Sequence, residues 1–455
     1  MINMILELNA HKVFQNSGIK YLYIAQTGAL FELDEKTDFL ITMNGCSIER
    51  IQEEMLCKFS TSQSEIEAML NDFRSVGLID TAIKKEELQY SLNYLHGVEL
   101  MVCQCCNLAC SYCYASEGEY NHPGVMSENV GKKAIDFLFA HTQDDHVSIS
   151  FFGGEPLINI ELIKILVEYA NQIALQNDKH ISYAVTTNGT LISEDIANFF
   201  KANNFYVSFS VDGTQVKHDL HRISKSGVGS YDNSVKNIHL LGKNHISLRA
   251  TSTPENDDYV EIAEALYNQR KTDFYIGEAM NCFQTEESLQ AVECSYDRLI
   301  KHFYTDLQHG KIDKCKANSL IYQNLKKIAY FKERSCSCTA FITTLAVDVD
   351  GKMYPCHRFV GSSYVIGNVN LLEINIQNAA RLFEKDFLLK NRIGCSECWA
   401  QNLCVGGCPY INHEATGHCN IPNEMKCRLN KYLFEKLLIF FISLSDEEKH
   451  TLRLS

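Results

Sequence analysis

The sequence predicts an α/β fold, in which a partial barrel of six strand–helix units lies between an N-terminal module and a cysteine-rich C-terminal segment. Three observations support this prediction. Short apolar strands alternate with helical segments between residues 97 and 278. Unusual motifs stand where these strands end. Nine cysteines lie between residues 336 and 427, counting both ends.

The predicted barrel strands are bounded by glycine-rich or polar turns, and helical text follows most of them. We expect the barrel domain to extend over residues 97–325 and the cysteine-rich domain over residues 326–455. Because parallel barrels gather their active sites at the carboxyl ends of the strands, the motifs at those ends should share one mouth. The six strands are expected at Val98–Val102, Val147–Phe152, Ile181–Val185, Tyr206–Val211, Ile246–Thr251 and Phe274–Glu278.

The first 85 residues predict a small winged-helix-like module. Residues 19–33 indicate two short strands around a turn at Gly28. Three helical segments are expected near 35–43, 48–58 and 62–76. Residues 86–96 are expected to be a linker to the barrel.

Composition limits the possible functions. The chain has 455 residues, enough for two to four domains, and its net charge of −14 argues against nucleic acid as the main partner. Its first residues lack the features of a signal peptide, so we expect a cytoplasmic protein. Nineteen cysteines then indicate metal or redox chemistry rather than a disulfide scaffold. The apolar run at 437–442 is too short to cross a membrane, and we expect a helix packed on the body or, alternatively, a dimer contact.

Cys106, Cys110 and Cys113 follow the first barrel strand with the spacing C-x3-C-x2-C. Three thiolates on one short loop can hold three irons of a [4Fe–4S] cube, and a fourth cysteine would close it. This spacing therefore leaves one iron open to a ligand. The alternatives are a redox thiol patch that includes Cys103 and Cys105, and a zinc site, which normally needs four ligands.

The C-terminal cysteines form a longer pattern. Cys338 is followed by twelve residues, Gly351, four residues and Cys356. A second group has the spacing C-x2-C-x5-C-x3-C, and one more cysteine follows after a gap: Cys395, Cys398, Cys404, Cys408 and Cys427. One or two zinc ribbons are the alternative interpretation.

The first motif, with Tyr112 before its last cysteine, resembles the cluster loop of radical S-adenosylmethionine (SAM) enzymes. The C-terminal pattern resembles the SPASM extension found in the same superfamily, so the resemblance covers residues 97–430. It implies an open iron that binds SAM and a one-electron cleavage that yields methionine and a 5′-deoxyadenosyl radical. It also implies two auxiliary [4Fe–4S] clusters, which makes three clusters in all.

The resemblance assigns residues to SAM at the barrel mouth. Gly153, Gly154 and Glu155 form the turn that meets its amino group, and a glycine pair permits close backbone approach. Asn188 and Ser210 match positions that face its ribose or carboxylate. Arg222 is the expected partner of the carboxylate, with Arg249 as a rival. Tyr112 packs on adenine or in the core, and Glu278 is expected to point into the same mouth and contact the substrate.

The resemblance also assigns the auxiliary clusters. Cys338, Cys356 and Cys408 share the first, whose fourth ligand is either Cys336 or a substrate thiolate. The second is held by Cys395, Cys398, Cys404 and Cys427.

Two SPASM subgroups compete for the reaction. Sulfatase-maturing enzymes, which make formylglycine, usually place an aspartate base after the cysteine of G-x4-C, where this chain has His357. A cysteine–histidine pair, together with the text at 114–120 and 151–156, is similar to the ranthipeptide type of peptide maturase, which forms thioethers. His can also act as a base.

This resemblance implies that the substrate is a cysteine-containing precursor peptide and that a flavodoxin- or ferredoxin-type protein supplies electrons. The N-terminal module is similar to a PqqD-like domain, which holds a leader peptide as an added strand. A plain packing domain is the alternative. A carbon–carbon crosslinker, an epimerase, and a structural zinc or electron-transfer iron–sulfur protein also remain as alternatives.

Replacement of Cys110 tests the first cluster. We expect Cys110→Ala to abolish reductive cleavage of SAM and to remove about four of about twelve irons, since each cube holds four. Cys404→Ala is the matched control, because it should spare SAM cleavage and impair peptide modification. Cleavage that persists in Cys110→Ala would contradict the assignment.

Overall fold

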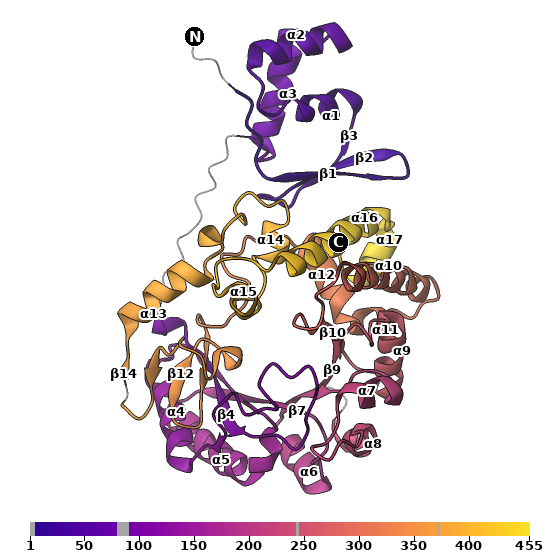
Figure 1. Cartoon of the computed structure of the whole chain (residues 1–455). Helices are drawn as coiled ribbons and strands as arrows, with labels where there is room; N and C mark the ends of the chain where they lie inside the picture. Colours follow the sequence, from indigo (N-terminus) through magenta and orange to yellow (C-terminus); the bar gives the residue numbers. More distant parts are fainter. Residues whose placement is uncertain (1–4, 80–90, 243–244, 372) are drawn as a thin grey trace. The chain divides into compact units, whose positions relative to one another are not determined.

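The computed structural model describes residues 5–79, 91–242, 245–371 and 373–455. The chain folds into two compact units (Figure 1). The barrel unit combines residues 89–322 with 338–385. The terminal unit combines residues 1–88 with 323–337 and 386–455, so the N-terminal module and most of the C-terminal cysteines share one unit. Of the linker expected at 86–96, residues 86–90 lie outside the described residues.

The barrel unit contains the six expected parallel strands, each paired with the next along the chain. Their order in the sheet is β4-β6-β7-β8-β9-β10, and a two-residue strand, β5 (Gly124–Val125), pairs with β4. The strands are β4 (Gly97–Gln104), β6 (His146–Gly153), β7 (His180–Thr187), β8 (Tyr206–Ser210), β9 (Ile246–Ser252) and β10 (Phe274–Glu278). The predicted α/β class is therefore confirmed.

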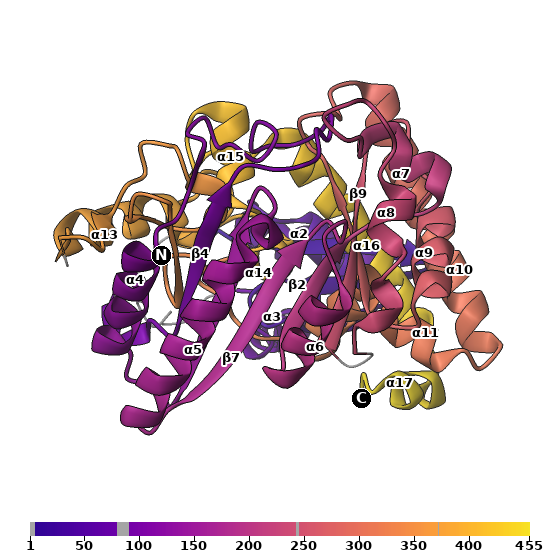
Figure 2. The same ribbon diagram turned by 90° about the horizontal axis from the view of Figure 1, so that it is seen from below.

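Helices cover the outer face of this sheet (Figures 1 and 2). Alternate strand residues such as Leu100, Phe151 and Phe209 are fully buried beneath them. Ser127 caps the first of these helices, as expected: its hydroxyl accepts from the Val130 amide at 3.3 Å. The helices are α4 (Glu128–His141), α5 (Ile160–Gln176), α6 (Glu194–Ala202), α7 (Gln215–His221), α8 (Tyr231–Val235) and α9 (Tyr259–Gln269), followed by α10 (Glu286–Gln308), α11 (Ile312–Ala317) and α12 (Ser319–Ala329).

The inner face of the sheet is polar. Register pairing places Ser210 beside Arg249, and Arg249 beside Tyr275, on the face turned away from the helices. Arg249 is exposed and Ser210 is half-buried. A face of small and polar side chains at the carboxyl ends of parallel strands is suited to binding a ligand.

The cysteine-rich segment extends the barrel sheet. β11 (Thr344–Val347) pairs in parallel with β4, and antiparallel strands follow it: β12 (Lys352–Tyr354), β13 (Gly367–Asn368) and β14 (Glu373–Ile374). The fully buried Gln104 fixes this junction, because its side chain accepts from the Val349 amide and donates to the His122 carbonyl. The turn between β11 and β12 is thereby held against the end of β4. A helix, α13 (Ile376–Leu382), follows.

The N-terminal module matches its prediction and adds one strand. β1 (His11–Asn16), β2 (Ile19–Ile24) and β3 (Leu30–Leu33) form an antiparallel sheet, of which β1 was not expected. Helices α1 (Glu35–Thr42), α2 (Ile48–Phe59) and α3 (Gln63–Ser75) follow. Asp34, Ser47 and Ser62 cap them, as short polar side chains do at helix N-termini.

The module packs on the C-terminal helices within the terminal unit. Trp399 lies edge-on to Tyr23, Lys12 pairs with Glu435 at 2.8 Å, and Asn402 donates to the Ala25 carbonyl at 2.6 Å. The apolar run at 437–442 lies in α16 and is largely buried, as expected for a helix packed on the body. Among the described residues, no helix is long and apolar enough to cross a membrane. These helices are α14 (Gln401–Cys404), α15 (Pro409–Thr416), α16 (Glu424–Ser443) and α17 (Asp446–Leu452).

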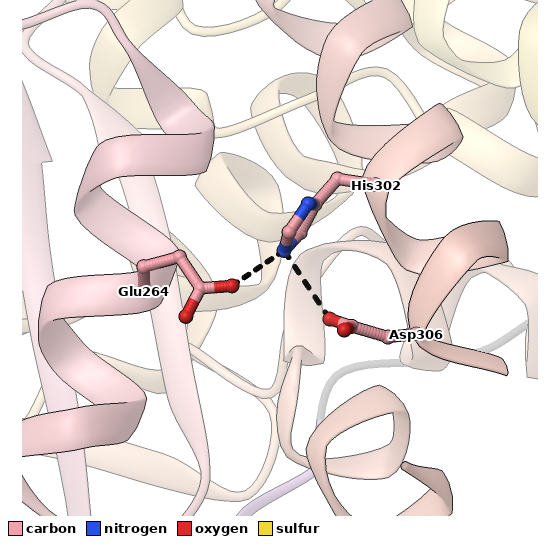
Figure 3. A group of neighbouring side chains, drawn as sticks. All are labelled: Glu264, His302 and Asp306. Carbon is pink, nitrogen blue, oxygen red and sulfur yellow. Dashed lines mark hydrogen bonds and ion pairs between the residues drawn. The ribbon is translucent and has the colours of Figure 1, made fainter. Parts of the chain in front are cut away.

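One charged cluster joins three helices of the barrel unit. The ligand atoms of Glu264, His302 and Asp306 all lie within 4.8 Å of one another, a spacing that one metal ion could bridge, and no other three His, Cys, Asp or Glu residues in the described part of the chain lie so close (Figure 3). Lys314 already supplies the cation: its ammonium contacts Asp306 at 2.8 Å and also pairs with Glu264. We therefore interpret the cluster as an ion-pair network rather than a metal site.

The network depends on Lys314. Burial by itself raises the pKa of Asp306, but the hydrogen bonds from Lys314 and Lys311 outweigh burial and hold that pKa below its usual 3.8. The same balance, again with Lys314, holds the pKa of Glu264 below its usual 4.5. A carboxyl whose pKa is lowered by folding stabilises the fold above its unfolded pKa and loses that contribution as pH falls.

We expect Lys314→Met to lower the free energy of unfolding by about 3 kcal/mol at pH 7, because it leaves the buried Asp306 without its main cation. Lys311→Met is the matched control: Lys311 pairs with the same carboxylate from an exposed position, where a pair contributes less than about 1 kcal/mol. Urea unfolding at several pH values measures both. The Lys314 deficit should shrink as pH falls below about 4, where the carboxylates become protonated in both proteins. Equal losses for the two variants at pH 7 would contradict the assignment.

Candidate functional site

The loop that carries Cys106, Cys110 and Cys113 follows β4 directly. The Cys113 amide donates to the Cys110 carbonyl at 3.0 Å, which closes a turn. The segment after α7 braces the loop, because the Ala109 amide donates to Ile223 at 2.7 Å and the Ser111 amide donates to His221 at 3.1 Å. Burial raises the pKa of the Cys106 thiol to about 12, so an iron cluster, which needs thiolates, would have to supply the compensating charge.

Gly153 and Gly154 lie against this loop. The Gly154 amide donates to the Cys103 carbonyl at 2.8 Å, and the Glu155 amide donates to the Cys105 carbonyl at 2.9 Å. A Cβ on Gly153 would lie 2.1 Å from the Cys103 oxygen, and one on Gly154 would lie 2.3 Å from the Cys105 oxygen. The close approach that requires glycine is therefore to the cluster loop itself.

Glu155 is fully buried and joins the ends of β6 and β7. Oε1 accepts from the Leu157 amide at 3.1 Å and the Thr187 hydroxyl at 2.7 Å, and Oε2 accepts from the Asn188 amide at 2.7 Å. Burial raises the pKa of Glu155 to about 7, although these hydrogen bonds oppose the change. Since each carboxylate oxygen has two lone pairs, Oε2 can accept one further donor, which fits an ammonium group.

Asn188 contacts the cluster loop through its side chain. Nδ2 of Asn188 donates to the side-chain Oδ1 of Asn107 at 2.9 Å and approaches the Cys106 sulfur at 3.8 Å. Oδ1 of Asn188 accepts from the Thr190 amide. Asn188 is therefore part of the hydrogen-bond network around the cluster loop. Its predicted contact with the SAM ribose or carboxylate stays a prediction.

Arg222 is held beneath the loop by Asp212. Its Nε donates to Asp212 Oδ2 at 2.9 Å, and the Tyr112 hydroxyl donates to the same oxygen. Burial favours a neutral Arg222, but the charge of Asp212 outweighs burial and raises the pKa of Arg222 above its usual value. Burial also raises the pKa of the Cys110 thiol, which the Arg222 charge opposes. The contacts of Arg222 and Tyr112 are thus with Asp212, and their roles toward SAM stay predictions.

Arg249 and Ser210 lie side by side on the inner face, where β9 pairs with β8. The Arg249 guanidinium packs 5.6 Å from the centre of the Tyr275 ring. Neither side chain forms a hydrogen bond with any described residue. The two therefore offer a free cation and a free hydroxyl at the carboxyl ends of the strands.

His357 lies on the inner face against Glu99 and Phe152. Glu99 Oε2 accepts from the His357 amide at 3.0 Å and lies 3.1 Å from Nδ1, and the imidazole stacks on Phe152 with ring centres 4.2 Å apart. Burial by itself raises the pKa of Glu99, but the charge and hydrogen bonds of His357 outweigh burial and lower it. Nδ1 is thereby oriented toward Glu99, which leaves Nε2 for a ligand.

Glu278 is the last residue of β10, and its side chain lies on the face of the strand that is turned toward the helices. Its Oε1 accepts from Tyr259 of α9 at 3.2 Å and from Tyr296 of α10. We expected this side chain to point into the mouth, but strand alternation directs it toward the helices, whereas Tyr275 and Gly277 share the inner face. Its contact with substrate stays a prediction.

The four thiols assigned to the second auxiliary cluster all belong to the terminal unit. Burial raises the pKa of the Cys395 thiol to about 12, and the charges of Cys427, Cys404 and Cys398 raise it further. The Asn430 amide donates to the Cys404 sulfur at 3.2 Å. A closed cluster needs four thiolate ligands, and the assignment of these four cysteines to it stays a prediction.

The first auxiliary set is divided between the two units. Cys338 and Cys356 belong to the barrel unit, whereas Cys336 and Cys408 belong to the terminal unit. The shared cluster therefore stays a prediction, as does the choice between Cys336 and a substrate thiolate for its fourth ligand.

Two residues of the site were missed by the motif analysis. Glu99 interrupts the apolar text of β4, and a carboxylate within a buried strand is a signal that sequence can give. Asp212 stands in an Asp-Gly pair, which is typical of an ordinary turn. Its partners lie 10 and 100 residues away along the chain, so the sequence offers no direct signal for them.

The close approach of Gly154 to the cluster loop generates a test. We expect Gly154→Ala to cost the chain about four irons, one cube, because the new Cβ meets backbone that cannot move without displacing Cys105 and Cys106. Gly242→Ala is the control, since the backbone of Gly242, like that of Gly154, is not left-handed, and a Cβ there would have no neighbour within 4 Å. Iron per chain measures both, and full iron in Gly154→Ala would contradict the prediction.

Two domain families match the chain. The Radical SAM superfamily matches residues 100–266, and the SPASM iron–sulfur cluster-binding domain matches residues 336–399. The second match ends before Cys404, Cys408 and Cys427. The assignment of these three cysteines therefore depends on the spacing pattern.

Relatives agree with these matches. A cysteine-type anaerobic sulfatase-maturating enzyme of Clostridium novyi is 26% identical over 73% of this chain and 92% of its own length. The radical SAM cyclopropyl synthase TigE of Paramaledivibacter caminithermalis is 24% identical over 90% of both chains. The structure of anSMEcpe with bound AdoMet shares the fold, with a TM-score of 0.62 and 21% identity over 76% of this chain and 98% of its own. The chain belongs to the radical SAM superfamily and is an enzyme with a SPASM domain.

Proposed function

We propose that this enzyme matures a ribosomally made precursor peptide by joining the sulfur of a peptide cysteine to a carbon of the same peptide. The observation that carries the proposal is the N-terminal module, which forms one compact unit with most of the C-terminal cysteines. The sulfatase-maturating relative from C. novyi aligns with 73% of the chain, whereas TigE aligns with 90%. A module that accompanies the catalytic domains in this way is suited to delivering a peptide.

The module offers an open strand edge. Among the described residues, β3 pairs with β2 alone, so the backbone groups of its other edge are free to pair with a further strand. Phe31 and Glu32 on β3 are exposed. An extended leader peptide would add to this edge through backbone hydrogen bonds, and side-chain contacts would give specificity.

The barrel residues fit the proposed cofactors. Cys106, Cys110 and Cys113 would hold the open cluster, and Glu155 retains an acceptor for the amino group of SAM. Arg249 and Ser210 are available for a carboxylate, while Arg222 already pairs with Asp212. When bound, the cluster and SAM supply a 5′-deoxyadenosyl radical that removes a hydrogen atom from the peptide. A flavodoxin- or ferredoxin-type protein would supply the electron.

His357 is the candidate acceptor of the peptide thiol proton. Glu99 contacts Nδ1 of the ring, so Nε2 is the nitrogen left to accept a proton. The S–H proton would pass to Nε2, the C–H hydrogen would leave with the adenosyl group, and the C–S bond would form. One electron enters to cleave SAM and one electron leaves as the bond forms, so the reaction balances.

Formylglycine formation is the second candidate. Similarity to cysteine-type sulfatase-maturating enzymes favours it. His357 stands where those enzymes usually have an aspartate, and this departure favours the thioether reaction. Both reactions begin with a cysteine and differ in whether the sulfur stays in the product.

Product analysis distinguishes these reactions. The full chain is co-expressed anaerobically with each short cysteine-containing peptide encoded beside its own gene, and the products are analysed by mass spectrometry after thiol alkylation. A thioether removes two hydrogens and one alkylatable thiol per crosslink. The Cys110→Ala variant is the control, since it should leave every peptide unmodified.

Other outcomes are equally clear. Loss of sulfur from the cysteine would favour formylglycine and refute the proposal. Loss of two hydrogens with every thiol retained would indicate a carbon–carbon crosslink, and an unchanged mass with an altered stereocentre would indicate an epimerase.

A further inference from the structure

Arg392 is a buried cation in the terminal unit, with an exposed fraction of 2%. It follows a short 3-10 turn, η7 (Leu389–Asn391), and precedes Cys395 by three residues. Nη1 donates to the carbonyls of Gly406 and Gly407, and Nη2 donates to the Phe387 carbonyl at 3.4 Å. The Nε–H group has no partner.

No carboxylate pairs with this guanidinium in the described ranges of the chain. Its printed partners are three neutral carbonyl groups, which orient the side chain but do not balance its charge. Arginine is almost never fully buried without a paired anion, because taking an unbalanced charge out of water is costly. The fold therefore places a positive charge where some negative charge is required.

Cys395 is the cysteine that the structure ties to Arg392. The Cys395 amide donates to the Arg392 carbonyl at 3.2 Å, and the Arg392 charge lowers the pKa of the Cys395 thiol against the larger effect of burial. Gly406 and Gly407 lie between Cys404 and Cys408. Gly406 has to be glycine here, since its φ is 76° and a Cβ would lie 2.4 Å from Arg392 Cδ. Arg392 is thus built into the loop that carries these thiols.

We propose that Arg392 is the buried counter-cation of an iron–sulfur cluster held by Cys395, Cys398, Cys404 and Cys427, and that its charge raises the reduction potential of that cluster. A cube with four thiolates is anionic, and reduction adds one more negative charge, so a fixed nearby cation stabilises the reduced state. The inference rests on the proposed cofactor content and is independent of the proposed thioether reaction.

Lys431 provides a matched control. Its charge also opposes the raised pKa of the Cys398 and Cys427 thiols, so it belongs to the same neighbourhood. Lys431 is exposed, however, whereas Arg392 is buried. Water and salt screen an exposed charge, so Lys431 should affect the cluster much less.

The experiment measures the potential of this cluster in the full chain. Replacing Cys106, Cys110, Cys113 and Cys356 with alanine leaves the cluster under study as the one that gives a signal, and electron paramagnetic resonance follows it during a redox titration. In that background we compare Arg392→Gln, Arg392→Lys and Lys431→Gln. At the midpoint of the parent, Arg392→Gln should lower the ratio of reduced to oxidised cluster at least tenfold, which is a shift of about 59 mV to more negative potential for one electron. Arg392→Lys and Lys431→Gln should change the ratio less than threefold.

The following results would overturn the proposed role of Arg392. An unchanged potential in Arg392→Gln with full iron overturns the inference, and so does an Arg392→Lys variant that shifts as far as Arg392→Gln. If Arg392→Gln fails to assemble the cluster, iron per chain decides: iron retained by Arg392→Lys supports the charge role, and loss in both variants overturns it. Zinc in place of iron at these cysteines also overturns it. A negative shift in a protein that makes no thioether leaves the inference standing while refuting the proposed reaction.

Discussion

The site depends on the backbone contact between the end of β6 and the loop that follows β4. The Gly154 amide donates to the Cys103 carbonyl, and the Glu155 amide donates to the Cys105 carbonyl. A Cβ at Gly153 or Gly154 would overlap one of these carbonyl oxygens, so neither position can hold a larger residue. This contact fixes the cluster loop against the sheet. Glu155 then links this contact to the end of β7, because its carboxylate accepts from the Thr187 hydroxyl and the Asn188 amide. The position of the three thiols thus follows from the packing of strand ends rather than from the loop alone.

Charge burial organises both units around their cysteines. In the barrel unit, Arg222 lies beneath the cluster loop and is balanced by Asp212, which the Tyr112 hydroxyl also contacts. In the terminal unit, Arg392 is buried three residues before Cys395, and its printed hydrogen-bond partners are carbonyl groups. The two buried arginines therefore differ in that a carboxylate balances Arg222, whereas no carboxylate of the described residues pairs with Arg392. The ion-pair network around Lys314 follows the ordinary rule, with carboxylates surrounding one ammonium.

The extension of the barrel sheet by β11 brings the cysteine-rich segment into the catalytic unit. Because β11 pairs with β4, the residues after β12 reach the inner face, where Glu99 orients His357 and Phe152 stacks on its ring. Domain boundaries drawn from cysteine spacing separate this segment from the barrel, while the hydrogen-bonded sheet joins them. The remaining cysteines belong with the N-terminal module. The N-terminal module and most of the C-terminal cysteines are therefore parts of one compact unit.

The sequence by itself determined the α/β class, the positions of six barrel strands, three helices of the N-terminal module and the three cysteine groups, because strand alternation, capping residues and ligand spacing are local properties of the chain. The tertiary structure alone decided which side chains meet. It paired Arg222 with Asp212, directed Glu278 toward Tyr259 and Tyr296, left Arg249 free beside Ser210, and brought Glu99 to His357 across 258 residues. Such contacts depend on strand register and on the pairing of distant segments, and a one-residue change of register would send each side chain to the opposite face.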